Sequence, residues 1–192
     1  MREQPPAIAS GQPTINIVGA RLALGPFDRE LMATYCRWLN DFRMMRTIGQ
    51  PVPYTLEQVA GDYRQLSDSS RVTSFTIYER VSGRPIGNTA WTEIDWQNGT
   101  AEYVLYIGEA DCRGKGYGSE VTRLMLDYAF GTLGLHNVML RVYGYNLAGY
   151  HAYLKAGFRE CGRRRQCKRL GGELWDVIYM ECLAAEFPQS FT

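Results

Sequence analysis

The feature that most constrains this chain of 192 residues is a glycine-rich segment, Arg113-Gly114-Lys115-Gly116-Tyr117-Gly118-Ser119-Glu120, that leads directly into an amphipathic helix. The helix is predicted from four apolar residues at the i, i+3, i+4 and i+7 spacing of one face, which are Val121, Leu124, Met125 and Tyr128. The first backbone N–H groups of such a helix lack intrahelical partners, and the helix dipole places partial positive charge beside them. The segment therefore predicts a binding site for an anion such as pyrophosphate.

The alternating glycines give an anion access to the backbone, because a Cβ would hold the anion away or forbid a positive φ. Arg113 and Lys115 add full positive charges. Two other phosphate-binding loops do not fit. A Walker A loop would need Gly and then Ser or Thr where Glu109 and Gly116 stand, and a dinucleotide-binding fingerprint would need Gly in place of Ser119. A glycine-rich helix N-terminus without a ligand remains the alternative for this segment taken alone.

The pattern that remains is Arg-x-x-Gly-x-Gly, filled by Arg113, Gly116 and Gly118. It resembles the coenzyme A pyrophosphate loop of the GNAT superfamily of N-acetyltransferases. A second block, residues 146–158, lies one helix and one strand downstream and resembles the other signature of that family. In that signature an Asn opens a short helix, a Tyr follows two turns later, and Lys-x-Gly-Phe ends the helix.

Five residues of the second block match this signature in order and spacing, namely Asn146, Tyr153, Lys155, Gly157 and Phe158. Gly149 departs from it, because the family usually has Ala there and glycine costs a helix about 1 kcal/mol. The resemblance covers about residues 21–182, nearly the whole chain. Within the family the chain is most similar to the branch that contains spermidine acetyltransferases and ribosomal-protein N-terminal acetyltransferases.

Composition fits one globular domain, with 45% hydrophobic and 21% charged residues, and gives no indication of disorder. The 21 basic and 20 acidic residues leave a net charge of +1, so there is no global electrostatic case for nucleic-acid or membrane partners. No apolar stretch or leader pattern indicates a membrane span or export, and a cytoplasmic enzyme is expected. Five cysteines without CxxC spacing and two histidines predict neither a disulfide framework nor a metal site.

Local patterns predict a flexible arm over residues 1–14 and a single domain over residues 15–192. Helices are expected over residues 31–46 and after the capping box formed by Thr55 and Gln58, in addition to the two helices above. A strand or hairpin is expected over residues 15–24, and strands over 72–80, 86–96, 100–107, 138–142, 158–167 and 174–182. These elements indicate an α+β or mixed α/β class. The resemblance implies the GNAT fold, a mostly antiparallel twisted sheet of six to seven strands splayed in the middle and flanked by about four helices.

The resemblance also implies that acetyl-CoA is the cosubstrate and that no metal takes part. The pyrophosphate of the coenzyme would bind the loop residues Arg113, Gly114, Lys115, Gly116, Tyr117, Gly118 and Ser119. The strand end at Leu105, Tyr106 and Ile107 would splay from the strand at 138–142, pair with the pantetheine amides and supply an oxyanion donor. Asn146 would bind the coenzyme or the loop backbone, and Lys155 would meet the adenosine phosphates or merely solvent.

Tyr153 is the expected general acid, because the family places this hydroxyl near the coenzyme sulfur. A phenol with a pKa near 10 can protonate a departing thiolate at neutral pH. The alternative is a core tyrosine bonded to a backbone carbonyl. Glu102 is the candidate general base on an alternating strand face, with a solvated, salt-bridging carboxylate or a water chain as the alternatives. Glu93 and Asp95 are further carboxylates that could bind a cationic acceptor.

The predicted activity is direct acetyl transfer in a ternary complex to a primary amine, either a small molecule or a peptide. Candidates are a polyamine, an antibiotic or metabolite amine, or a protein N-terminus, and the loop at residues 47–53 is expected to contact the acceptor. A different acyl group remains open. The rival hypothesis is a non-catalytic acyl-CoA-binding sensor or interaction module on the same fold, which loss of Tyr153 or of the loop glycines would mark. Nucleic-acid binding through Arg163-Arg164-Arg165 is disfavoured, since arginines on an edge strand commonly block further pairing. A homodimer is compatible with the sequence.

Overall fold

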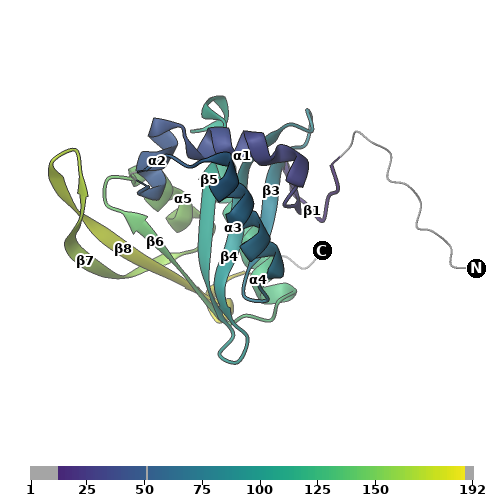
Figure 1. Cartoon of the computed structure of the whole chain (residues 1–192). Helices are drawn as coiled ribbons and strands as arrows, with labels where there is room; N and C mark the ends of the chain where they lie inside the picture. The colour runs from purple at the N-terminus through teal and green to yellow at the C-terminus, as the bar shows by residue number, and fades with distance from the viewer. Residues whose placement is uncertain (1–12, 51, 189–192) are drawn as a thin grey trace, which may run out of the picture.

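The computed structural model describes residues 13–50 and 52–188 (Figure 1). Almost all of the arm expected over residues 1–14 lies outside this part of the chain. The described residues form one sheet of eight strands in the order β1-β2-β3-β4-β5-β6-β8-β7. Neighbouring strands are antiparallel except β5 and β6, which are parallel. The strands are β1 (Ile17–Val18), β2 (Leu22–Pro26), β3 (Thr73–Glu79), β4 (Pro85–Asp95), β5 (Thr100–Ile107), β6 (Asn137–Tyr143), β7 (Arg159–Leu170) and β8 (Glu173–Leu183).

Helices cover both faces of the sheet, as Figure 1 shows, with α1 and α3 on one face and α4 and α5 on the other. The helices are α1 (Met32–Leu39), α2 (Phe42–Ile48), α3 (Leu56–Asp68), α4 (Tyr117–Gly131) and α5 (Leu147–Ala156), and short 3-10 turns span Arg29–Leu31, Ala110–Cys112 and Ala184–Glu186. This arrangement confirms the mixed α/β class. The sheet has eight strands where six to seven were expected, because the segment predicted as a strand or hairpin forms the hairpin of β1 and β2.

The core is divided between the two faces because successive side chains of β5 alternate in direction. Ala101 and Tyr103 point to the α4 and α5 face and join a large apolar cluster. Tyr106 points to the opposite face, where it packs with a smaller cluster built on Tyr35 and Trp38 of α1. β5 therefore lies between the two helical layers and contributes side chains to the apolar cluster on each face of the sheet.

The helix expected over residues 31–46 is interrupted, and the prediction of one continuous helix is wrong. Asp41 caps α2 by accepting a hydrogen bond from the Arg43 N–H at 2.9 Å. Asn40 follows the end of α1 and donates from its side chain to the carbonyls of Cys36 and Tyr54, at 2.8 and 2.9 Å. Both residues have the short polar side chains that favour helix ends, and their bonds satisfy backbone groups that the break exposes.

The two hairpins predicted from turn residues are present. Asn98-Gly99 joins β4 to β5, with Gly99 at φ 60°. The turn at Gly171-Gly172 joins β7 to β8, and this hairpin extends beyond β6 toward α2 (Figure 1). Lys168 fastens it there by donating from Nζ to the Gly49 carbonyl at 2.7 Å. None of the helices in the described ranges is long and apolar enough to cross a membrane.

Candidate active site

The sheet opens between β5 and β6. Their parallel pairing ends at Glu102 and Met139, whereas β5 stays paired with β4 as far as Ile107. The Gly108 N–H bonds the Ile86 carbonyl at 2.8 Å. Because ladder bonds alternate between the two sides of a strand, the polar groups of Leu105 and Ile107 face the β6 side. The predicted splay is present, and we call it the fork.

Of the three residues predicted to bind pantetheine, Leu105 and Ile107 direct their backbone groups into the fork. Tyr106 directs its own toward β4. The Ile107 carbonyl already accepts a hydrogen bond from Arg113 Nε at 3.0 Å. The N–H and C=O of Leu105 are thus the best-placed backbone groups for an added strand-like ligand.

The glycine-rich segment has the conformation that an exposed helix N-terminus requires. Gly116 is the N-cap of α4 with φ 80°, and Gly114 has φ 74°. The N-cap position carries no side-chain hydrogen bond to the helix. No heavy atom lies within 4 Å of a Cβ built on Gly114, and the nearest to one on Gly116 is Arg21 Nη2 at 3.6 Å. The loop is therefore open to solvent where an anion would approach.

Arg113 does not direct its guanidinium into this opening. The side chain donates to the Gly108 carbonyl at 2.8 Å and pairs with Asp41 Oδ2 at 2.9 Å, besides its bond to Ile107. Burial acts to raise the pKa of Asp41, but hydrogen bonds from Arg113 and from the Arg43 N–H outweigh it and lower that pKa. Arg113 thus fastens the loop to the end of β5 and to the start of α2, and Lys115 is the exposed cation of the segment.

The remaining loop residues anchor α4 to its neighbours. The Tyr117 hydroxyl donates to Glu79 on β3 at 2.9 Å. Ser119 Oγ donates to the Ala152 carbonyl of α5 at 3.2 Å. Because Ala152 precedes Tyr153, this bond brings the start of α4 beside the helical turn that carries the predicted acid.

Tyr153 lies in an aromatic cluster, with its ring 6.1 Å from those of both Tyr103 and Phe158. Burial raises its pKa to about 12. No hydrogen-bond partner for its hydroxyl occurs in the described part of the chain, and no buried polar side-chain atom there is unpartnered, so the hydroxyl reaches accessible space. The alternative of a core tyrosine bonded to a carbonyl is not observed. The hydroxyl stays protonated at neutral pH and its proton is uncommitted.

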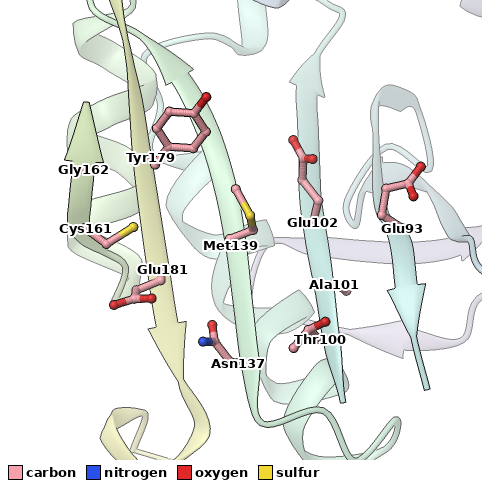
Figure 2. Close-up of a pocket in the computed structure, with 10 residues that line it drawn as sticks. All are labelled: Glu93, Thr100, Ala101, Glu102, Asn137, Met139, Cys161, Gly162, Tyr179 and Glu181. Carbon is pink, nitrogen blue, oxygen red and sulfur yellow. The ribbon is translucent and has the colours of Figure 1, made fainter. Parts of the chain in front are cut away.

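A cavity of about 630 Å³ lies at the base of the fork (Figure 2). Strands β4, β5, β6, β7 and β8 all contribute to its lining, which consists of Glu93, Thr100, Ala101, Glu102, Asn137, Met139, Cys161, Gly162, Tyr179 and Glu181. Glu102 belongs to the side of β5 opposite Tyr103, so the cavity and the Tyr153 cluster lie on opposite faces of the sheet. The fork connects the two faces at the point where Glu102 and Met139 end their pairing.

The carboxylates predicted for catalysis or acceptor binding have different surroundings. Glu102 forms a two-contact ion pair with Arg141, at 2.6 and 3.1 Å. Glu93 enters the cavity from an irregularity in β4, where its φ is 50°, and pairs with Arg71 at 3.2 Å. Asp95 instead binds Asn98 in the adjoining turn, at 2.9 and 2.8 Å. It does not line the cavity.

Comparison with known proteins agrees with this geometry. Residues 21–159 match the family model described as the acetyltransferase (GNAT) domain. This chain belongs to the GNAT acetyltransferase family. The acetyltransferase is 32% identical over 174 residues to the uncharacterized N-acetyltransferase YnaD of Bacillus subtilis (strain 168), covering 90% of this chain and 99% of the relative. It is 26% identical over 171 residues to the uncharacterized N-acetyltransferase p20 of Bacillus licheniformis, covering 87% and 95%.

Solved structures show the same fold. The acetyltransferase superposes on the spermidine N-acetyltransferase of Vibrio cholerae, solved in complex with CoA and spermine, with a TM-score of 0.79. That match covers 86% of this chain and 97% of the other at 24% identity. A GNAT-family acetyltransferase from Bacillus anthracis gives 0.76 at 22% identity, covering 88% and 99%. The solved structures show the fold, and the family model together with the relatives makes the chain an acetyl-CoA-dependent acyltransferase.

The second family block, residues 146–158, forms helix α5 and its two caps in the acetyltransferase. Asn146 caps α5, since its Oδ1 accepts from the Gly149 N–H at 3.0 Å, and no bond joins it to the glycine loop in the described residues. A Cβ on Gly149 would lie 2.8 Å from Asn146 Nδ2, which explains the departure from Ala. Lys155 is exposed in the last turn of α5.

Sequence reasoning missed the cavity residues that β6 and β8 supply. Met139, Tyr179 and Glu181 are brought beside Glu102 only by the pairing of β5 with β6 and of β6 with β8. Their alternation within each strand was the available signal, but it does not say which strands are neighbours. The loop at residues 47–53 was expected to contact the acceptor, but none of its described residues lines this cavity. Gly49 instead lines a separate cavity beside the β7–β8 hairpin.

Helix α1 also contacts the turn at Gly108 and Glu109, which Arg113 holds through the Gly108 carbonyl. Trp38 Nε1 donates to Glu109 Oε1 at 2.9 Å, and Arg37 pairs with the same oxygen at 2.5 Å. The Trp38 indole lies directly on Gly108, where a methyl group would overlap the ring. The end of β5 is thus packed under a fully buried tryptophan.

Replacing Gly108 by Ala is expected to destabilise the fold by about 1–3 kcal/mol, because the added methyl overpacks a site that Trp38 already fills. Urea unfolding of the two proteins measures this difference. Gly61→Ala in α3 is the matched control, since no heavy atom lies within 4 Å of a Cβ at that position. The control is expected to be neutral or stabilising by up to about 1 kcal/mol. Equal stability of Gly108→Ala and wild type would contradict the close packing.

Proposed function

We propose that this acetyltransferase moves the acetyl group of acetyl-CoA directly to a primary amine while both substrates are bound. The observation that carries the proposal is the fork, because it joins two differently built sites. The glycine loop and Tyr153 lie on its α4 and α5 side. The carboxylate-lined cavity lies on the other side and includes Glu102 at the branch point.

The coenzyme would enter from the α4 side. Its pyrophosphate would take hydrogen bonds from the N–H groups that open α4, beside the charge of Lys115, and Lys155 would lie near the adenosine end. The pantetheine amides would pair with the free backbone groups of Leu105 as an added strand does. The Leu105 N–H would then stabilise the oxyanion, a contribution of roughly 3 kcal/mol in comparable acyl-transfer sites.

The transfer step forms an N–C bond and breaks the thioester C–S bond. The neutral amine attacks the carbonyl carbon, and Tyr153 gives its proton to the departing thiolate. The amine must first lose a proton. Both Glu102 oxygens are bound by Arg141, and this hydrogen bond raises the pKa of the Arg141 guanidinium, so both carboxylate oxygens are already committed. This favours cavity water as the carrier of the amine proton, with Glu102 as the nearest carboxylate.

The chemistry of the cavity indicates which kind of acceptor it would bind. Its carboxylates, Glu93, Glu102 and Glu181, suit a cationic amine better than a neutral or acidic acceptor. A similar Vibrio protein is a spermidine N-acetyltransferase, which supports the same acceptor chemistry in this fold. The competing idea of a non-catalytic coenzyme sensor is disfavoured, because the loop glycines and an uncommitted Tyr153 hydroxyl are both in place.

Direct transfer is expected to give intersecting lines when initial rates are measured against acetyl-CoA at several fixed amine concentrations. A covalent acyl-enzyme would give parallel lines instead. The cavity thiol, Cys161, is the nucleophile to exclude, and burial followed by the nearby Glu181 charge raises its pKa, which disfavours the thiolate. Cys161→Ser is therefore expected to keep the wild-type rate. Parallel lines, or an acetylated Cys161 detected by mass spectrometry without amine, would contradict direct transfer.

A further inference from the structure

The charges that line the cavity are mostly compensated by residues of the protein itself. Glu102 is held by Arg141 and Glu93 by Arg71, as described above. Glu181, on β8, has no ion pair among the residues that the structure describes, and it is half-buried. Its charge is nevertheless felt inside the cavity, since it contributes to the raised pKa of Cys161. The cavity therefore offers one uncompensated negative charge.

In the register of β7 and β8, Arg159 stands opposite Glu181, but its guanidinium pairs with Glu186 at 2.9 Å. The register of β6 and β8 separates Glu181 from Arg141. Met139 pairs with Glu181, and Arg141 pairs with Tyr179. Two residues of strand place Glu181 roughly 7 Å from Arg141 along the sheet. Met139 is also the last β6 residue paired with β5, so Glu181 lies across from the branch point of the fork. Between these two charged positions the lining is apolar or aromatic, provided by Met139 and Tyr179.

We propose that the acceptor of this acetyltransferase is a monoamine with an apolar body, not a polyamine. The inference rests on the proposed function and specifies its substrate class. A single ammonium group would pair with Glu181 beside the fork, and its carbon chain would cover Met139 and Tyr179. A second ammonium group a few ångströms farther along would meet the ion pair of Glu102 with Arg141, where the carboxylate is already neutralised and the guanidinium opposes another cation. A polycation requires a series of uncompensated carboxylates, whereas this cavity offers one.

Hexylamine and hexane-1,6-diamine test this directly, because they match in length and differ in the second charge. For the wild-type enzyme at low ionic strength, kcat/KM for hexylamine is expected to exceed that for the diamine by about tenfold or more. The ratio should shrink as salt is added, since exposed charges are screened. Arg141→Gln is expected to reduce or reverse the preference because it removes the opposing cation and frees Glu102. Arg71→Gln, which frees Glu93, serves the same purpose should Arg141→Gln fold poorly.

A separate experiment tests whether Glu181 binds the ammonium group. Glu181→Gln is expected to raise KM for hexylamine about tenfold while kcat stays within about threefold, because the ammonium loses its partner but the chemistry is untouched. Glu173→Gln, the same change at the far end of β8, is the control and should leave both constants unchanged. A diamine preferred by the wild type would overturn the monoamine inference alone. No transfer to either amine would overturn the inference together with amine acetylation, and that outcome is distinguishable from a reversed preference.

Discussion

Tyr153→Phe is expected to lower kcat by roughly 100- to 10,000-fold, the range typical of a lost general acid. The substitution keeps the ring that packs against Tyr103 and Phe158 and deletes only the hydroxyl. Because that hydroxyl makes no hydrogen bond with described residues, its removal leaves no buried partner unsatisfied. Stability and coenzyme affinity should therefore stay close to wild type. The loss should appear in turnover.

Measuring kcat with any accepted amine, together with a calorimetric Kd for acetyl-CoA, separates the possible roles of Tyr153. Tyr128→Phe on α4 is the control for loss of a hydroxyl elsewhere and should leave both values unchanged. Since burial raises the Tyr153 pKa to about 12, the acid form persists below that pH, and its deprotonation should limit the rate only as the pH rises toward 12. A Phe variant with most of its kcat would show that water protonates the leaving thiolate. Collapsed binding with unchanged kcat would place Tyr153 in the coenzyme pocket.

Gly116→Val is expected to raise the Kd for acetyl-CoA by roughly 10- to 100-fold, the equivalent of about one lost hydrogen bond to a charged group. A side chain there projects from the N-cap of α4 into the space where the phosphate would approach the helix. The position also has φ 80°, which strains any branched residue. Gly134→Val, at φ 69° and with no heavy atom within 4 Å of its Cβ, carries the same strain away from the loop.

Titration calorimetry and urea unfolding of both valine variants separate strain from obstruction. Both should lose similar stability, but only Gly116→Val should lose coenzyme affinity. Unchanged affinity in a folded Gly116→Val protein would remove the loop from coenzyme binding. Equal losses of affinity in the two variants would attribute the effect to backbone strain.

Most of the fold could be predicted because its signals are local. Alternation in β3, β4 and β5, the Asn98-Gly99 turn and the capping box at Thr55 each lie within a few residues, and each is present in the structure. The break between α1 and α2 was missed although Asn40-Asp41 carried a signal. Its apolar residues keep helical spacing across the break, and the polar pair was given less weight than that spacing.

The site was predictable only to the extent that its residues are neighbours in sequence. The glycine loop, the α5 cap and Tyr153 belong to two short blocks, so their positions on helix ends followed from spacing. The partners of Arg113 and Glu102 did not. Arg113 bonds Asp41, 72 residues away, and Glu102 bonds Arg141, 39 residues away, and both pairings depend on how helices and strands are placed in space. Charge alone suggested that Arg113 would face the phosphate, and it could not say which residue, if any, would pair with Glu102.

The two bonds of Asp41 have a consequence for how the substrates influence each other. One oxygen caps α2 and the other holds Arg113, so a single carboxylate joins the start of α2 to the segment that opens α4. A shift that the coenzyme imposed on that segment would act on α2 through this carboxylate. Thermodynamic linkage is reciprocal, so by whatever factor bound acetyl-CoA changes the affinity for the amine, the amine changes the affinity for acetyl-CoA by the same factor. Breaking the Asp41 contact would remove the part of this coupling that passes through α2.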